Sequence, residues 1–183
     1  DVRTLFSDVD RQSVSSISLK IDSSRMLLSS QGDSRIFKLH QNALEVHRLV
    51  ENIARQYGFH LVDAGISDYI LKLESALPND EGACIENVSA ARKGLNYTAS
   101  IMTLGIMPAS GSFCYAVSAG LYEGEGEQGM IGTFSSSQGG VDVYAGANDI
   151  DNYQRVITRH DEEQALELSI GYLFKKMLDE GAF

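Results

Sequence analysis

The sequence predicts an α+β domain in which two helices pack on one face of a mostly antiparallel sheet. Three observations predict this class: a strand pattern near the start, a strong amphipathic helix after it, and a run of consecutive strand patterns before a closing helix. This β-α-β-β-β-β-α order differs from the regular alternation that builds parallel sheets. The 183 residues suffice for one buried core. We expect residues 1–183 to form a single domain, with residues 1–13 as an N-terminal tether or extension.

The first two elements follow from the spacing of apolar residues. In residues 14–22, Val, Ile and Leu alternate with polar residues, which is typical of a strand with one buried face. Across residues 39–57, apolar residues recur at steps of three and four with charged residues opposite them, which predicts an amphipathic helix of about 20 residues. Gly58 follows at the position where a left-handed C-cap favours glycine.

The middle of the chain predicts strands. Residues 59–63 form a short strand pattern, and in residues 68–76 the side chains alternate between a buried and a solvent-facing side. The stretch 94–122 contains no charged residue, but Pro108 and several glycines and serines interrupt it near its middle. A membrane-spanning helix would need about 20 predominantly apolar residues without such a break, so this stretch predicts two core strands joined by a turn.

Two further strands and a helix complete the predicted fold. Residues 130–137 and 141–146 have strand patterns. Asp161 followed by Gln164 has the spacing of a capping box, so we expect the closing helix to begin at Asp161. The predicted apolar face of this helix consists of Leu166, Ile170, Leu173 and Met177.

A G-x-G-x-x-G pattern occurs at Gly124, Gly126 and Gly129. In the dinucleotide fingerprint these glycines open a helix whose N-terminus holds the pyrophosphate. Here a strand pattern follows them, and three acidic residues alternate with them, where they would repel phosphate. These acidic residues are Glu123, Glu125 and Glu127. We therefore predict a hairpin tip rather than a nucleotide site, and no cofactor.

The net charge of −10 is unevenly distributed along the chain. Residues 1–59 carry eight Lys or Arg and seven Asp or Glu, whereas residues 60–183 carry seven and eighteen. Such a surface repels nucleic acids and anionic membrane surfaces, so neither is an expected partner. Charge complementarity would instead speed association with a basic protein, and the acidic hairpin is our candidate interaction loop.

The sequence predicts neither a catalytic nor a metal site. His47 and Glu51 are one turn apart on the first helix and could seat a metal ion, but no third strong ligand is indicated. Ser110 lies in a serine-rich turn without the pattern of a nucleophile elbow. Carboxylate pairs such as Asp149 and Asp151 occur where loops favour acidic residues. We expect a non-enzymatic protein.

The chain has two cysteines, Cys84 and Cys114. They permit one intramolecular disulfide, which would close a loop of about thirty residues, and two free thiols are the alternative. Neither cysteine belongs to a C-x-x-C pattern, so a zinc site is not indicated.

Two passages resemble small outer-membrane lipoproteins of Gram-negative bacteria. They are "YGFHLVDAGISDYILKLE" and "IMTLGIMPASGSFCYAVSAGLYEGEG", and the resemblance extends over about residues 36–183. The chain departs from that pattern because the given sequence has no lipid-bearing cysteine at its start; Asp1 would then follow a removed anchor segment.

The resemblance transfers no catalytic residues. It implies a periplasmic accessory or assembly protein, tethered peripherally to the outer membrane, that binds a component of the cell envelope or of a secretion system. In that oxidising compartment we expect Cys84 and Cys114 to form a disulfide. The alternative function is an acidic inhibitor or immunity protein that covers a basic enzyme or toxin.

Overall fold

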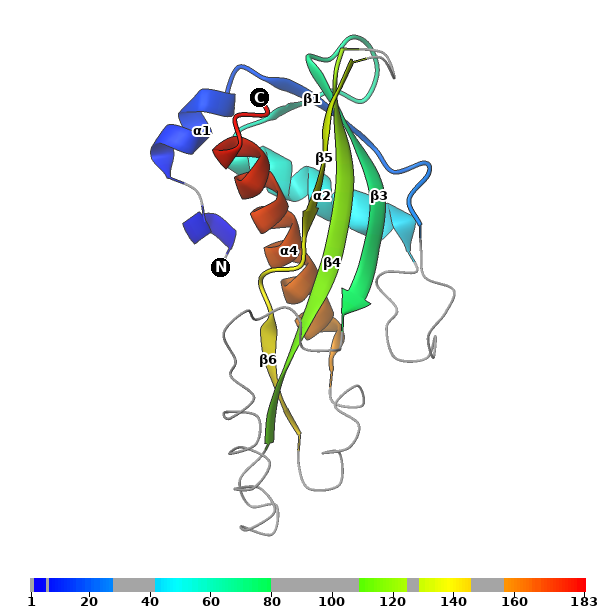
Figure 1. Ribbon diagram of the computed structural model, residues 1–183, viewed down its shortest axis with the longest axis vertical. Coiled ribbons are helices and arrows are strands. Elements are labelled where there is room, and N and C mark those ends of the chain that lie inside the picture. Colours follow the sequence, from blue (N-terminus) through cyan, green and yellow to red (C-terminus); the bar gives the residue numbers. More distant parts are fainter. Residues whose placement is uncertain (1, 6, 28–41, 80–108, 125–128, 146–156) are drawn as a thin grey trace.

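The computed structural model describes residues 2–5, 7–27, 42–79, 109–124, 129–145 and 157–183 (Figure 1). The helices of these segments are η1 (Val2–Leu5), α1 (Asp8–Val14), α2 (Ala43–Tyr57) and α4 (Arg159–Asp179). The strands are β1 (Ser18–Asp22), β2 (His60–Leu61), β3 (Tyr69–Asn79), β4 (Ala109–Glu123), β5 (Met130–Ser136) and β6 (Val141–Ala145). The predicted strand pattern ahead of Pro108 lies outside the described residues.

The described strands form one six-stranded sheet with the order β2-β1-β3-β4-β5, and β6 pairs with β4 beyond the end of β5. β3, β5 and β6 run antiparallel to β4. β1 is parallel to β2 and β3. α2 lies between β1 and β2 in the chain, and such a helical crossover returns the next strand in the same direction. The α+β prediction with a mostly antiparallel sheet is confirmed.

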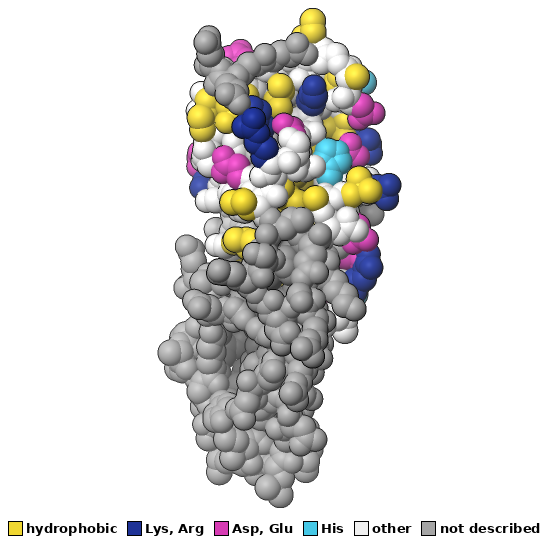
Figure 2. Space-filling view, turned by 90° about the vertical axis from the view of Figure 1, so that its right-hand side faces the viewer, with side chains coloured by type: hydrophobic (Ala, Val, Ile, Leu, Met, Phe, Trp, Pro, Cys, Tyr) yellow, Lys and Arg dark blue, Asp and Glu magenta, His cyan; other side chains and the backbone are white. Residues whose placement is uncertain are grey.

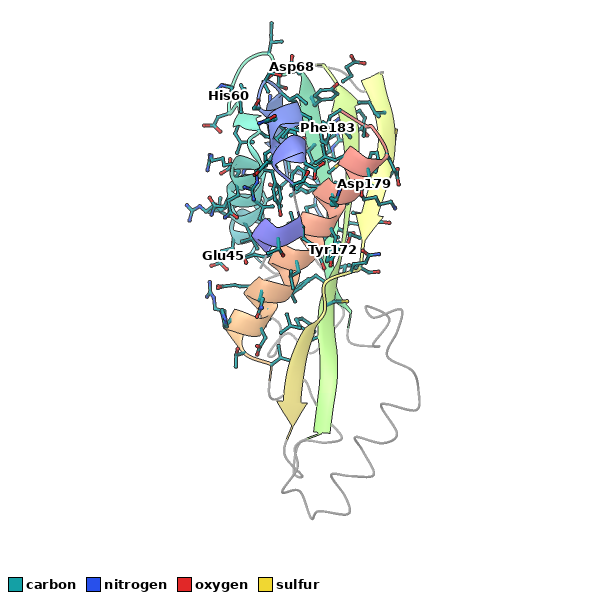
Figure 3. All side chains as sticks on the ribbon, turned by 90° about the vertical axis from the view of Figure 1, so that its left-hand side faces the viewer. Glu45, His60, Asp68, Tyr172, Asp179 and Phe183 are labelled. Atoms are coloured by element: carbon teal, nitrogen blue, oxygen red, sulfur yellow. The ribbon has the colours of Figure 1, made fainter. Side chains whose placement is uncertain are left out.

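Both long helices pack on the same face of the sheet (Figure 3). α4 lies over β4 and β5, and α2 lies beside α4 over β1 and β2. The strand register places Ile21, Leu71 and Leu121 in one row across β1, β3 and β4. Leu71 and Leu121 are fully buried against the helices. The predicted apolar face of the closing helix is fully buried as well.

The N-terminal region differs from the predicted strand over residues 14–22. Val14 is the last residue of α1, and β1 begins only at Ser18. Ser7 caps α1, since its hydroxyl accepts from the Asp10 amide (3.2 Å) and the Asp10 carboxylate accepts from the Ser7 amide (2.9 Å). Val14 is 1% exposed because it lies on the buried side of this short helix. Its burial therefore reflects helix packing, although the residue also fits the alternating pattern of a strand. In the stretch expected as a tether, η1 packs against α4 and α1 against α2.

The ends of the two long helices test two sequence predictions. Gly58 caps the C-terminal end of α2 in a left-handed conformation (φ 99°), as the sequence predicted. The prediction that Asp161 caps the closing helix is wrong. Thr158 is the N-cap, because its hydroxyl accepts from the Asp161 amide (3.3 Å) while the Asp161 carboxylate accepts from the Thr158 amide (2.8 Å). The reciprocal pair of bonds therefore forms three residues earlier than the sequence pattern suggested.

Two residues fix α4 to the sheet at the connection between β5 and β6. The Ser169 hydroxyl lies 2.6 Å from the carbonyl oxygen of Tyr115 and 2.9 Å from that of Gln138. Gly139 has φ +89°, and a Cβ at this position would lie 2.5 Å from the Cβ of Leu168. The helix thus approaches the connection so closely that only glycine fits there.

Candidate functional site

One end of the sheet carries the hairpin that the sequence singled out. β4 ends at Glu123 and β5 begins at Met130, and the loop between β2 and β3 lies beside them (Figure 1). The amide of Gly124 donates to the carbonyl of Asp68 (2.9 Å), which ties the two connections together. We call residues 62–68, 123, 124 and 129–131 the acidic end.

The sequence segments that meet at the acidic end contain acidic residues but neither Lys nor Arg. Asp63 and Asp68 lie in one connection, and Glu123, Glu125 and Glu127 lie in the other. The side chains of Asp63, Asp68 and Glu123 are exposed, whereas Glu125 and Glu127 lie outside the described residues. The described part of the candidate interaction loop is therefore acidic, and the β2–β3 loop adds to its charge.

Asp68 stabilises the acidic end from within. Its carboxylate accepts from the amide (2.8 Å) and the hydroxyl (2.7 Å) of Ser18, and its own amide donates to the same hydroxyl (2.8 Å). These bonds to the Ser18 hydroxyl and amide hold the pKa of Asp68 below its usual value. The loop is thus anchored to the start of β1, and the Asp68 carboxylate stays ionised well into the acidic range.

Exposed hydrophobic side chains gather at the same end. Ile66 is 85% exposed, Met130 51% and Ile131 42%, and these are three of the five large hydrophobic side chains that the described residues expose. In Figure 2, which views the molecule from the side opposite to Figure 3, the topmost described side chain is hydrophobic and the Lys and Arg side chains lie below it. Burying one such side chain against a partner contributes about 1.5–3 kcal/mol, so this end favours association.

The structure brings His47 and Glu51 together with a serine that sequence reasoning missed. The Ser23 hydroxyl lies 3.0 Å from His47 Nδ1, and His47 Nε2 lies 3.4 Å from Glu51 Oε1. The other carboxylate oxygen of Glu51 lies 3.6 Å from the Arg55 guanidinium. Within the described segments, no group of three His, Cys, Asp or Glu side chains is arranged to hold a metal ion.

A serine, an imidazole and a carboxylate in this order resemble a proton relay. However, Glu51 is also paired with Arg55, and its separation from His47 exceeds that of a strong hydrogen bond. We assign the cluster a structural role, because it connects the residue that follows β1 to the outer side of α2. Only the helical half of this cluster, His47 and Glu51, had a sequence signal, which was their spacing of four residues.

A second polar contact missed by sequence reasoning is buried in the core. Glu162 is 3% exposed, and its carboxylate accepts from the hydroxyl of Tyr115 (3.3 Å). The sequence places Glu162 in the first turn of the closing helix, where the helix dipole favours an acidic side chain. Its burial had no local signal, because Tyr115 lies 47 residues away in the chain.

The remaining sequence predictions concern cysteine and serine residues. Cys114 is fully buried in β4. Cys84 lies outside the described residues, so its pairing with Cys114 stays a prediction.

Ser110 does not lie in a turn: it is part of β4, opposite Tyr144 of β6. Extension of β4 past the serine-rich stretch is stabilised by backbone pairing with β6, which has no local sequence signal. Asp149 and Asp151 also lie outside the described residues.

No known protein-family model matches this chain, and a comparison with curated proteins finds no match. None of the helices in the described segments combines the length and the apolar character that crossing a membrane requires.

Proposed function

We propose that the protein is a non-enzymatic accessory or assembly module of the Gram-negative cell envelope, which binds a protein partner through the acidic end. The observation that carries the proposal is the coincidence of exposed Ile66, Met130 and Ile131 with carboxylates in segments that contain neither Lys nor Arg. In protein interfaces, apolar side chains form the buried centre and surrounding charges set the association rate and the choice of partner. The expected partner presents basic residues around an apolar surface.

The periplasmic location is part of this proposal. The resemblance to outer-membrane lipoproteins supports it, and a disulfide of Cys114 would persist there, because structural disulfides persist in oxidising compartments. We propose that Cys84 is the partner of Cys114, and that a lipid on a cysteine upstream of Asp1 anchors the protein to the outer membrane. Metabolic labelling of the full-length gene product with a palmitate analogue, followed by membrane fractionation, tests the anchor: an unlabelled product in the cytoplasmic fraction contradicts it.

The same surface also fits a second function, an acidic inhibitor or immunity protein that covers a basic active site. The charge of residues 60–183 favours it, since seven basic and eighteen acidic residues leave a balance of −11. The identity of the partner separates the two functions. A soluble basic enzyme or toxin that loses activity on binding supports the inhibitor, and an envelope or secretion component supports the accessory module.

Site-specific photo-crosslinking in cells tests the binding surface directly. We would place a photoreactive phenylalanine analogue at Ile66 or at Ile131, and at Gln56 on the exposed side of α2 as a control position. We expect positions 66 and 131 to crosslink to the same protein and position 56 not to do so. Crosslinks at position 56 without any at the other two positions would contradict the proposal.

Charge reversal provides the second arm of the experiment. Glu123→Lys reverses one carboxylate of the acidic end, and Glu74→Lys is the matched control because Glu74 is exposed on β3, between its ends. We expect Glu123→Lys to lower the association rate about tenfold at low salt and Glu74→Lys to leave it nearly unchanged. Equal effects of the two variants would mean that only the net charge matters.

A further inference from the structure

β5 has the features of a strand that accepts another strand. It ends the sheet order, and no described strand pairs with its outer side (Figure 3). Its seven residues, Met130–Ser136, include neither a charged residue nor a proline, although such residues commonly protect exposed edges. The unpaired amides and carbonyls of an edge strand are a template for pairing with an extended segment.

The position of β5 is fixed, so the template is already formed. Phe134 is 6% exposed and Ser136 8%, which anchors the strand to the helical layer. The alternate residues Thr133 and Ser135 are exposed. Because the strand is held in one register, an added strand would gain backbone hydrogen bonds without the entropy cost of ordering β5.

One side chain of this protein already contacts the backbone of β5. Lys176 lies in the last turn of α4, and its ammonium group donates to the carbonyl of Ser135 (3.4 Å). A lysine at this position is the kind of protection that edge strands commonly have. It contacts only the far half of the strand, so the half that begins at Met130 adjoins the acidic end without such a contact from the described residues.

We propose that the partner adds an extended segment to β5 as a further strand, with Lys or Arg at the end of the segment that adjoins Met130. This inference rests on the proposed function and names its binding mode. The charges of the acidic end select the basic residues, and the exposed Met130 and Ile131 select apolar residues next to them. A second copy of this chain is the less favourable occupant because each copy carries a net charge of −10.

Synthetic peptides test the proposal on the full chain. Three peptides share an alternating Val-Thr core and carry Lys-Lys, Ser-Ser or Glu-Glu at both ends, so that a charged end adjoins Met130 in either strand direction. We expect the Lys-Lys peptide to bind at least about tenfold more tightly than the Glu-Glu peptide, measured by fluorescence anisotropy. We also expect it to slow the hydrogen exchange of the amides of β5 and to leave the exchange of β2 unchanged. Binding of all three peptides with equal affinity, or without protection of β5, would overturn the proposal.

A backbone-modified peptide distinguishes strand addition from other modes of binding. N-methylation of alternate residues in the Lys-Lys peptide removes hydrogen-bond donors along one side while its side chains stay the same. One set of such peptides is methylated at odd positions and the other at even positions. We expect at least one of the two sets to lose about tenfold or more in affinity. If both sets bind like the parent peptide, strand addition is wrong.

The peptide experiments and the crosslinking experiment distinguish a failure of strand addition from a failure of the proposed function. Partner crosslinks at positions 66 and 131 that persist while no peptide protects β5 would sink strand addition and leave the binding surface in place. Self-association of the chain with protection of β5, in the absence of peptide, would identify a second copy as the occupant and overturn the proposed partner chemistry.

Discussion

β2 and β5 form the two edges of the sheet, and they differ in length and in what surrounds them. β2 has two residues, His60–Leu61, and the preceding Phe59 packs against two aromatic side chains: its ring centroid lies 5.5 Å from that of Phe174 and 4.9 Å from that of Phe183. β5 has seven residues, and Lys176 of α4 donates a hydrogen bond to its backbone. An edge of two residues offers little template for another strand, whereas a longer, charge-free edge offers one.

Contacts with α4 hold the sheet next to β5 on the side that faces the helices, whereas no described strand pairs with the outer side of β5. Ser169 contacts the carbonyls of β4 and of the β5–β6 connection, and Gly139 lies directly under α4. These contacts give the edge strand a fixed geometry without covering its outer backbone. Variants that weaken one edge at a time should therefore change the hydrogen exchange of that edge and not of the other.

Gly139→Ala should lower the free energy of unfolding by about 2–5 kcal/mol. Its φ of +89° is unfavourable for alanine, and the new Cβ would lie 2.5 Å from that of Leu168, so strain and overpacking add together. Gly65→Ala is the matched control, because Gly65 has φ +108° but no atom within 4 Å of an added Cβ, and should cost only about 1–2 kcal/mol. Urea denaturation of both variants measures the difference, and equal losses would mean that α4 does not restrain this connection.

Ser169→Ala should cost about 1–3 kcal/mol, since it removes a donor from the buried carbonyl of Tyr115 and from the carbonyl of Gln138. The amides of β5 and β6 should exchange faster, and those near β2 should not. The control is Ser13→Ala, whose exposed hydroxyl donates to the Asp10 carbonyl within α1, with an expected change below about 0.5 kcal/mol. A loss for Ser169→Ala no larger than that of the control would contradict the role assigned to its hydroxyl.

Phe183→Ala weakens the opposite edge. Phe183 contacts Phe59 and also Tyr69, at 5.4 Å between ring centroids, and each aromatic pair contributes about 0.5–1.5 kcal/mol beyond the area it buries. We expect a loss of about 1–3 kcal/mol from the two pairs and faster exchange of the His60 and Val62 amides, which donate to the carbonyls of Ile17 and Leu19. Faster exchange in β5 instead would show that the two edges are coupled.

Asp68→Asn should have the smallest effect, and it depends on pH. Hydrogen bonds from Ser18 lower the pKa of Asp68 in the folded state, so the carboxylate adds stability above its unfolded pKa, and this stability is lost as the pH falls through the lower folded pKa. The difference in melting temperature between the wild type and Asp68→Asn should therefore be present at neutral pH and shrink in strong acid. A difference that stays constant between neutral and strongly acidic pH would mean that the bonds do not depend on ionisation.

The candidate site was only partly predictable. The acidic hairpin was evident, because glycines alternate with Glu123, Glu125 and Glu127 between two strand patterns. The β2–β3 loop was not assigned to the same site, because the bond from Gly124 to Asp68 joins residues far apart in the chain. Exposure of Ile66 likewise had no local signal, since an apolar residue in a loop can be buried by any neighbouring element.

The sequence by itself determined the features that depend on neighbouring residues. Periodic apolar residues and Gly58 defined the buried side and the C-terminal end of α2, and the buried side of α4 followed from steps of three and four residues. The start of α2 at Ala43, after the N-cap Asn42, lies four residues later than the predicted start at residue 39. Tertiary structure decided the features that depend on distant residues: the helical state of Val14, the parallel pairing of β1, the burial of Glu162 and the open edge of β5. The physical reason is that helix periodicity and capping act within a few residues, whereas strand pairing and burial depend on which distant segments the folded chain brings into contact.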